Sequence, residues 1–291
     1  MARVVKYQVR AVGHLIAHYE RRQELNEKTG EMEYVKFGNR DIDPKWTPLN
    51  YRVWPPLEES VAYERELFQS EELLELWRGV GTDSEEPSLK RFRRIFDNTP
   101  HAKRRDLNCF CEWVISLPDE IPVERMQEFF DLCMRYCVHE YGAENMVGGW
   151  VHVDEDHRPH LHVAFVPVVT DKDGNKRICA KDLIDRKHLS GWHGGLTAVL
   201  QKAMDIENPG ILNGKTAAQG GNRTVKQMKA SDKAYARSKG KEVDRYRKSH
   251  LKPLTGTQKL ENLVTDAEER KNQKLIQPSP SRKSFWRSSR N

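Results

Sequence analysis

The chain has 291 residues, with 49 Lys and Arg against 43 Asp and Glu, and 37% of its residues are hydrophobic while 32% are charged. This composition argues against a membrane-spanning protein, because no apolar run approaches the roughly 18 residues that a spanning helix needs. Residues 1–6 also lack the apolar segment of a signal peptide, so we expect a cytoplasmic protein.

The charge is unevenly distributed along the chain. Residues 221–291 contain 19 Lys and Arg against seven Asp and Glu, whereas residues 1–220 contain 30 against 36. Basic residues favour a polyanionic partner, because they release the counterions that condense on phosphates. A basic C-terminal arm on an acidic body therefore indicates nucleic-acid binding, with a merely solvated tail as the alternative.

In chain order, the first elements are a strand, a hairpin and a helix. Residues 3–10 alternate valine and tyrosine with basic residues, which is typical of a strand. Residues 23–36 are polar around a Lys-Thr-Gly turn signal and indicate a loop or hairpin. Apolar residues at three- and four-residue spacing predict an amphipathic helix over residues 60–77.

The second half predicts further strands and helices. Strong β-formers predict a strand at 109–117, and residues 123–141 form a helical apolar stripe that we expect to face the core. Strands follow at 146–153 and 160–169, joined by a short polar link, and then a helix over 181–204 that we expect Gly191 and Gly194-Gly195 to interrupt. The order strand, helix, strand, strand favours an α+β fold with a largely antiparallel sheet.

The chain becomes polar and basic after residue 210. Gly220-Gly221 suggests a hinge, residues 224–249 a basic helix, and residues 277–291 a disordered terminus. We therefore expect a folded domain over residues 1–215 and a basic, helical and partly disordered tail over residues 216–291.

A cluster of histidines lies between residues 152 and 162. Alternate side chains of a strand share a face, so His160 and His162 should point the same way. If the preceding strand pairs antiparallel with theirs, His152 supplies a third neutral nitrogen for a divalent ion such as Zn²⁺, Mn²⁺ or Mg²⁺. Asp154 and Glu155 lie in the link, where they could orient a ligand or move a proton. The alternative is a set of histidines that only form hydrogen bonds in a half-buried sheet.

This cluster and three other segments resemble the MobV-type plasmid mobilisation relaxases, also called Mob/Pre or plasmid recombination enzymes. The sequence HVDEDHRPHLH at 152–162 is similar to the family's motif H-x-D-E-x-x-P-H-x-H, with one extra residue before the proline, and contains the His-hydrophobic-His pair of the HUH endonuclease superfamily. HYER at 18–21 resembles the family's H-N-x-R motif, and NRDID at 39–43 with Asn50-Tyr51 resembles its N-x-D-I-D and N-Y motif. Residues 111–115 and 180–183 are also similar, so the resemblance covers about residues 1–230.

The resemblance implies an HUH-type antiparallel sheet flanked by helices and a metal-dependent relaxase. Such an enzyme nicks one DNA strand at a plasmid origin of transfer and becomes covalently joined to the 5′ phosphate. The implied metal ligands are His152, His160 and His162, and the implied ion is Mn²⁺ or Mg²⁺, with Zn²⁺ as the alternative. The implied partners are single-stranded or hairpin plasmid DNA and coupling or accessory mobilisation proteins.

The resemblance also implies a catalytic group outside the metal cluster. His18 would be the nucleophile, Glu155 would accept its proton, and Arg21 would hold an adjacent phosphate. Tyr19 and Tyr51 stay open as alternative nucleophiles, because most HUH enzymes use tyrosine.

Five residues of the second motif and its surroundings are candidate DNA contacts. Arg40, Lys45 and Trp46 suit phosphate contact and base stacking, and Asn50 and Tyr51 complete the set, although a tryptophan here could equally serve packing. Two other functions stay open at this point: a rolling-circle replication initiator, and a non-catalytic DNA-binding protein whose histidines hold a structural metal.

Overall fold

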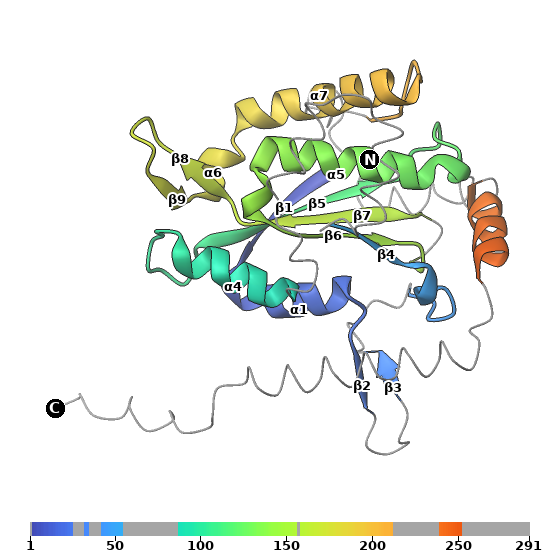
Figure 1. Ribbon diagram of the computed structural model, residues 1–291, viewed down its shortest axis with the longest axis horizontal. Coiled ribbons are helices and arrows are strands. Elements are labelled where there is room, and N and C mark those ends of the chain that lie inside the picture. Colours follow the sequence, from blue (N-terminus) through green and yellow to red (C-terminus); the bar gives the residue numbers. More distant parts are fainter. Residues whose placement is uncertain are drawn as a thin grey trace, which may run out of the picture. The chain divides into compact units, whose positions relative to one another are not determined.

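A five-stranded antiparallel sheet forms the centre of the protein (Figure 1). The computed structural model describes residues 2–25, 32–34, 42–54, 87–155, 158–211 and 239–251. The strands lie in the order β1-β5-β7-β6-β4, and every neighbouring pair is antiparallel. Their bounds, in that order, are Ala2–Gln8, Asn108–Ser116, His160–Phe165, Met146–His152 and Tyr51–Trp54. The predicted α+β class with an antiparallel sheet is therefore confirmed.

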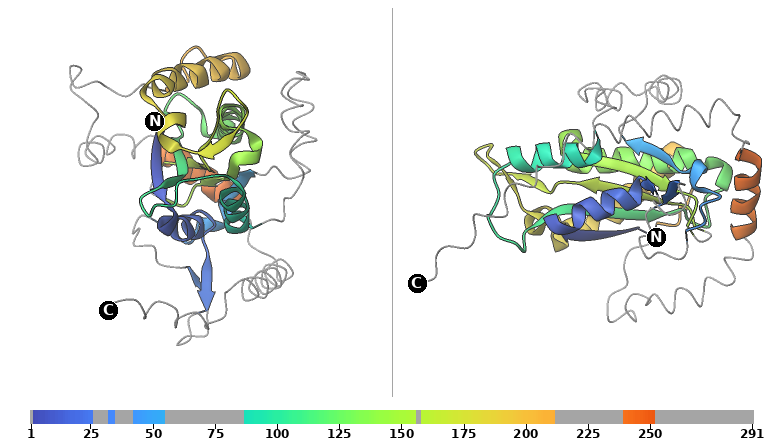
Figure 2. Two further views of the ribbon diagram at one scale, coloured as in Figure 1. Left: turned by 90° about the vertical axis from the view of Figure 1, so that its left-hand side faces the viewer. Right: turned by 90° about the horizontal axis from the view of Figure 1, so that it is seen from below.

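Helices cover both faces of this sheet (Figures 1 and 2). On one face lie α5 (Met126–Tyr141), which follows the short 3-10 helix η2 (Val123–Arg125), and α7 (Arg186–Met204). On the other face lie α1 (Val9–Tyr19) and α4 (Ser88–Asn98). Because strand side chains alternate, the sheet contributes one set of residues to each of two separate apolar clusters.

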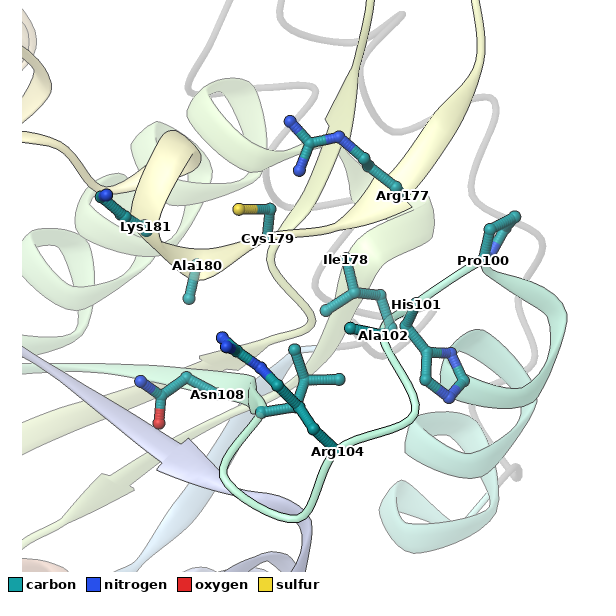
Figure 3. Close-up of a pocket in the computed structure, with 11 residues that line it drawn as sticks. Pro100, His101, Ala102, Arg104, Asn108, Arg177, Ile178, Cys179, Ala180 and Lys181 are labelled. Carbon is teal, nitrogen blue, oxygen red and sulfur yellow. The ribbon is translucent and has the colours of Figure 1, made fainter.

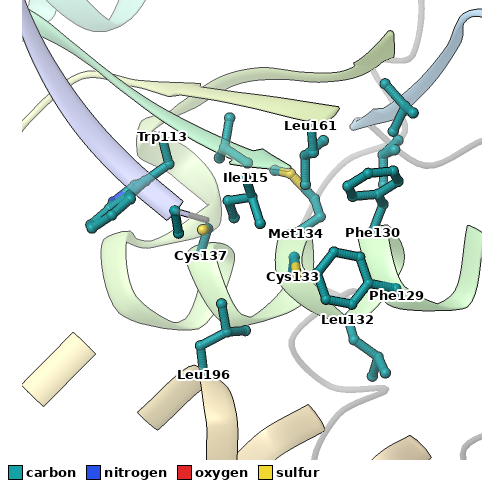
Figure 4. Close-up of a cluster of buried hydrophobic side chains, with 14 of the residues drawn as sticks. Trp113, Ile115, Phe129, Phe130, Leu132, Cys133, Met134, Cys137, Leu161 and Leu196 are labelled. Carbon is teal, nitrogen blue, oxygen red and sulfur yellow. The ribbon is translucent and has the colours of Figure 1, made fainter. Parts of the chain in front are cut away.

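The larger core lies beneath α5 (Figure 4). The predicted apolar stripe of this helix is buried as expected, and its members are Met126, Phe129, Phe130, Cys133, Met134, Cys137 and Tyr141. Trp113 of β5 stacks on Trp192 of α7, with ring centroids 3.6 Å apart, at the side of this core. The sequence pattern at 123–141 thus predicted both the helix and the face that it buries.

Shorter elements complete the described chain. The predicted hairpin is present as β2 (Gln23–Leu25) and β3 (Met32–Tyr34), and a second hairpin joins β8 (Val168–Thr170) to β9 (Lys176–Ile178). The strand predicted at 160–169 is divided at Pro167, which has no N–H to donate to a sheet ladder. The remaining short helices are η1 (Thr47–Leu49), η3 (Ala143–Asn145) and α6 (Ala180–Leu183).

The helix predicted at 181–204 breaks at a different place from the expected one. It divides at residues 184–185, where the Asp185 side chain accepts a hydrogen bond from the first turn of α7, whereas the glycines lie inside the continuous helix α7. Gly195 has a packing role, because a Cβ there would lie 2.3 Å from the Tyr136 hydroxyl oxygen of α5. The glycine allows α7 to approach α5 closely rather than ending the helix.

Part of the predicted basic helix is present over residues 239–250. Its Val243 is fully buried in the larger core, so this helix packs on the same unit as the sheet, which spans residues 1–250. The predicted helix at 60–77, most of the predicted tail and Arg40 lie outside the described residues, and the predicted domain boundary at 215 stays a prediction. In the described part of the chain, no helix is both long and apolar enough to cross a membrane.

Candidate active site

Adjacent strands bring the three predicted metal ligands together. His152 at the end of β6 pairs directly with His160 at the start of β7, and alternation places His162 on the same face of the sheet. Ring centroids are 5.5 Å apart for His152 and His160, 4.6 Å for His152 and His162, and 4.7 Å for His160 and His162. The prediction that His152 joins the other two histidines required antiparallel pairing of these two strands, and the strands pair in this way.

One ring nitrogen of each histidine is held by an oxygen acceptor. His152 Nε2 lies 2.8 Å from the Tyr19 carbonyl oxygen, and His160 Nδ1 lies 3.0 Å from that of Arg158. His162 Nδ1 lies 2.5 Å from Glu112 Oε1. Because these acceptors fix the ring N–H, the other nitrogen of each ring carries a lone pair.

Two of these lone-pair nitrogens are buried polar atoms without a hydrogen bond. Within the described residues, His152 Nδ1 and His162 Nε2 have no hydrogen-bond partner, and Glu155 Oε1 stands 3.5 Å from the former. Burial lowers the pKa of His152 to about 3 and that of His160 to about 4, with the charge of His162 adding to the second shift. These rings are therefore neutral at pH 7, as ligands for a divalent ion must be.

His18 reaches the same cluster from α1. Its Nε2 lies 3.3 Å from Glu155 Oε1, and its ring centroid is 5.5 Å from that of His152 and 5.8 Å from that of His162. Ligand atoms of His18, His152, Glu155 and His162 all lie within 4.8 Å of one another. The His18 side chain is 17% exposed, so this ring is more accessible from outside than the buried ring of His152.

Arg21 contacts two carboxylates of the site. It donates in bidentate geometry to Asp154, from Nε at 2.9 Å and from Nη2 at 2.8 Å, and Nη2 also lies 2.6 Å from Glu155 Oε1. Its Nη1 donates to the carbonyl oxygen of His18 at 2.7 Å, and the residue has a left-handed backbone with φ of 49°. The buried guanidinium connects α1 to the link between β6 and β7, and its expected contact with a phosphate stays a prediction.

Glu155 lies among the histidines of the site and beside Arg21. Burial acts to raise the pKa of this carboxyl, but the adjacent imidazoles of His152 and His18 and the charges of His160 and Arg21 lower it well below its ordinary range. Its Oε1 lies 3.3 Å from His18 Nε2, and the expected transfer of a proton from His18 to Glu155 stays a prediction.

The hydroxyl groups of both alternative nucleophiles are buried. The Tyr19 ring stacks on Trp150 with centroids 5.0 Å apart, and burial together with nearby Glu112 raises its pKa well above the ordinary value. Tyr51 pairs with Val151 and so lies on the face opposite His152, where its hydroxyl oxygen is buried and burial raises its pKa. Neither hydroxyl is presented to the accessible side of the cluster.

The second motif supports the site from the side. The Asp43 N–H donates to the Asp154 carbonyl oxygen at 2.9 Å, and Thr47 Oγ1 donates to the Asp154 carboxylate at 2.8 Å. Asn50 Oδ1 accepts from the Val153 N–H at 2.8 Å. The predicted DNA contact Asn50 therefore holds the strand end that carries Asp154.

Lys45 and Trp46 differ in what they offer to DNA. Lys45 is exposed, and its Nζ lies 4.6 Å from the centroid of the Trp46 ring. Trp46 is only 8% exposed. The guanidinium of Arg247, a residue of the helix over residues 239–250, lies 5.7 Å from the centroid of the Trp46 ring. The burial favours the packing role that the sequence left open for Trp46, and base stacking on this ring stays a prediction.

Two residues of the site were not predicted. Glu112 of β5 accepts hydrogen bonds from His162 and, at 2.8 Å, from the Tyr7 hydroxyl. Burial acts to raise the pKa of this carboxyl, but the hydrogen bonds and the charge of His162 outweigh burial and lower the pKa to about 2. A single Glu inside the apolar run CFCEWVISL was the signal for it. Arg247 donates from Nε to the Val153 carbonyl oxygen at 2.7 Å, and no local pattern indicates that contact.

Comparisons with known proteins find similarity to plasmid recombination enzymes. Residues 93–230 match the family described as plasmid recombination enzyme. A plasmid recombination enzyme of Streptococcus agalactiae is 23% identical over 206 residues, which is 69% of this chain and 35% of that protein. A type 1 enzyme of Staphylococcus aureus is 36% identical over 69 residues, 24% of this chain and 16% of that protein. The chain thus spans about a third or less of the length of these relatives.

A solved structure shares the fold. The MobM relaxase domain, bound to origin-of-transfer DNA of plasmid pMV158 and to Mn, superposes with a TM-score of 0.52 at 22% identity, covering 79% of this chain and 98% of that one. The expected antiparallel sheet flanked by helices is therefore confirmed, and it is the fold of this relaxase domain. With the family match over residues 93–230, the chain is similar in sequence to the plasmid recombination enzymes and shares the fold of this relaxase domain.

Proposed function

We propose that this chain is a metal-dependent relaxase, which nicks one strand of plasmid DNA at an origin of transfer and becomes covalently joined to the 5′ phosphate. The observation that carries the proposal is the cluster itself: neutral imidazoles with inward lone pairs stand beside a more accessible histidine from another element. The relative of the same fold is bound to DNA of this kind and to Mn, which supports the proposal.

The proposed metal ligands are His152, His160 and His162. The unpartnered nitrogens of His152 and His162 fit a divalent cation, Mn²⁺ or Mg²⁺ with Zn²⁺ as the alternative, because a bound ion would satisfy both buried atoms. Such an ion supplies neutralisation of the charge that develops on the non-bridging oxygens of the scissile phosphate.

His18 is the proposed nucleophile. A lone pair of its neutral imidazole attacks phosphorus, the bond from phosphorus to the 3′ oxygen breaks, and that oxygen takes a proton from solvent to become a free 3′ hydroxyl. The phosphorylated ring then loses its remaining N–H proton, which leaves a phosphoramidate to the 5′ end of the DNA. Attack by Tyr19 would require its buried hydroxyl to ionise beside Glu112.

Glu155 and Arg21 position the nucleophile. Glu155 Oε1 lies 3.3 Å from His18 Nε2, and Arg21 Nη1 lies 3.2 Å from His18 Nδ1, so both ring nitrogens have an adjacent partner. Arg21 also forms ion pairs with Glu155 and Asp154, which offsets the desolvation cost of placing two carboxylates beside the cluster.

We further propose that the protein acts in the cytoplasm on single-stranded or hairpin DNA of its plasmid, together with coupling or accessory mobilisation proteins. The basic tail, with 19 Lys and Arg against seven Asp and Glu over residues 221–291, supports a DNA partner.

The test is the covalent adduct. With Mn²⁺ present, single-stranded oligonucleotides that tile the candidate origin should give a protein–DNA adduct that peptide mapping places at His18 and that acid hydrolyses, since a phosphoramidate is acid-labile. His18→Ala should lower adduct formation by at least about 10³-fold, while Tyr19→Phe should keep most activity.

Three outcomes would redirect this proposal. An acid-stable adduct at Tyr19 would assign a tyrosine nucleophile. Nicking only at an origin of replication would favour a rolling-circle initiator. DNA binding without any adduct at any tiled sequence would favour a non-catalytic binder.

A further inference from the structure

One short segment of the acidic body is strongly basic. Residues 1–220 contain 30 Lys and Arg against 36 Asp and Glu, yet residues 88–108 alone contain seven basic residues against two acidic ones. This segment is α4 and the loop that follows it, and it lies on the sheet face that also carries α1 (Figure 1). The charge asymmetry of the chain is therefore not confined to its C-terminal arm.

Packing directs the charges of α4 outward. Phe92 and Ile95 are buried against the sheet, and helical periodicity then places Lys90, Arg93 and Arg94 on the exposed side. In this part of the described chain the aromatic rings Phe92 and Phe96 stack on each other with centroids 5.6 Å apart, and neither is exposed.

The first residue of α4 is connected to the candidate active site. Ser88 Oγ donates to Glu20 Oε1 at 2.6 Å, and Glu20 lies two residues beyond His18. Arg52 of β4 also donates to Ser88 Oγ, at 3.1 Å. The helix that carries these exposed cations therefore starts at a residue that is hydrogen-bonded to Glu20, two positions beyond the proposed nucleophile.

The loop after α4 extends the same charge to the far end of the sheet. The Ile178 N–H of β9 donates to the Pro100 carbonyl oxygen at 2.9 Å, which fixes the start of the loop. The loop then exposes Lys103, Arg104 and Arg105. A pocket of about 440 Å³ lies between this loop and residues 177–181, and its basic lining residues are Arg104, Arg177 and Lys181, with His101 (Figure 3).

We propose that this α4 surface, defined as Lys90, Arg93, Arg94, Lys103, Arg104 and Arg105, binds the phosphate backbone of double-helical DNA. The duplex would flank the strand that enters the histidine cluster, so the inference rests on the proposed function. The eleven residues of α4 span about 16 Å, which matches about five base pairs or half a helical turn.

The side chains present favour a duplex over single strands. Surfaces that bind single-stranded DNA combine cations with aromatic rings on which bases stack, and the rings here stack on each other instead. Duplex phosphates need only cations and backbone donors. Asp106 competes only weakly with phosphate for Arg104. Their ion pair, at 3.4 Å, joins two exposed side chains, and exposed ion pairs contribute little free energy.

The test compares two triple variants of the full chain. One neutralises the loop by Lys103→Gln, Arg104→Gln and Arg105→Gln, and the control neutralises exposed residues of α7, on the other face of the sheet, by Arg186→Gln, Lys187→Gln and Lys202→Gln. Each removes three positive charges from exposed positions, so net charge is matched. The probes are a 20-base-pair duplex and a 20-nucleotide single strand without self-complementarity, both of arbitrary sequence.

The loop variant should bind the duplex about tenfold more weakly at 0.1 M salt. The slope of log affinity against log salt should fall in magnitude by about 0.9 for each phosphate that the variant no longer neutralises, or about 2 to 3 in total. The α7 control should stay within about twofold of wild type, and the pair Lys90→Gln with Arg93→Gln should weaken duplex binding in the same direction as the loop variant.

Other results overturn the proposal or isolate it from the proposed function. Equal affinity and slope for the loop variant and the α7 control would refute the surface, and an equal loss on both probes would refute the choice of duplex. Adduct formation with a single-stranded substrate should be unchanged in the loop variant. Absence of any adduct with the wild-type protein would count against the relaxase reaction alone, because the duplex-binding measurement does not depend on adduct formation.

Discussion

Replacing Glu112 by Gln should weaken Mn²⁺ binding about tenfold while the fold is retained. Glu112 Oε1 holds His162 Nδ1 at 2.5 Å and so keeps the lone pair of Nε2 directed into the cluster. A hydrogen bond to a charged acceptor contributes about 1.5–3 kcal/mol, against about 0.5–1.5 for a neutral one. The difference of about 1.4 kcal/mol corresponds to one factor of ten, within the range known for residues that orient metal ligands.

Tyr7→Phe is the matched control for this substitution. It removes the other donor to Glu112, at 2.8 Å, but keeps the hydrogen bond between Glu112 and His162, so Mn²⁺ affinity should change less than about twofold. The assay is titration with Mn²⁺, in which the electron paramagnetic resonance signal reports the free ion, on protein whose thermal midpoint has been checked. Wild-type affinity in Glu112→Gln, or an equal loss in Tyr7→Phe, would refute the role of Glu112.

Two further predictions concern stability. Burial lowers the pKa of His152 to about 3 and that of His160 to about 4, so below the ordinary histidine pKa the unfolded chain binds more protons than the folded chain. The free energy of unfolding of metal-free protein should therefore fall by about 1–3 kcal/mol for each pH unit from 6.5 toward 4.5. Urea denaturation at each pH measures this free energy, and a value that does not change with pH would contradict the prediction. Arg247→Ala should lower the free energy of unfolding by about 2–3 kcal/mol, because the buried guanidinium donates a hydrogen bond to the Val153 carbonyl oxygen. The control Arg245→Ala, at an exposed position, should change this free energy by less than about 0.5 kcal/mol. Equal losses in the two variants would refute the role assigned to Arg247.

Local periodicity predicted the elements whose burial pattern is local. The stripe of α5 and the alternation of β7 each lie within one segment, so the buried helix face and the shared direction of His160 and His162 follow from spacing alone. The first strand and the hairpin at 23–34 were predicted for the same reason, from alternation and a turn signal.

The elements that sequence reasoning missed depend on neighbours far along the chain. Helix α1 follows β1 without a turn residue between Gln8 and Val9. Helix α4 is rich in basic residues, and Phe92 and Ile95 are its only buried apolar side chains. Gly195 reads as a helix breaker until Tyr136 of another helix is placed against it. In each case tertiary packing overrides the local propensity.

The same reasoning explains why residue types were predicted better than roles. Arg21, Trp46 and Glu155 were recognised as members of a site, but their roles depend on which charges surround them in the folded chain. A guanidinium suits a phosphate and a carboxylate equally, and only the structure shows the Asp154 carboxylate in bidentate contact with Arg21.

Asp154 is the point where the three sequence motifs meet. Its carboxylate accepts from Arg21, which follows the first motif's histidine, and from Thr47, and its carbonyl oxygen accepts from Asp43 of the second motif. Burial opposes ionisation of Asp154, yet the hydrogen bonds and charge of Arg21 lower its pKa, so this carboxylate is stable only while all three segments are folded together. The segments lie more than a hundred residues apart in sequence at their extremes, and a buried charge lacking its partners costs several kcal/mol. Formation of the histidine cluster and placement of His18 are therefore coupled. Asp154 and Glu155 follow the strand that carries His152, and they contact Arg21 and His18 at the end of α1.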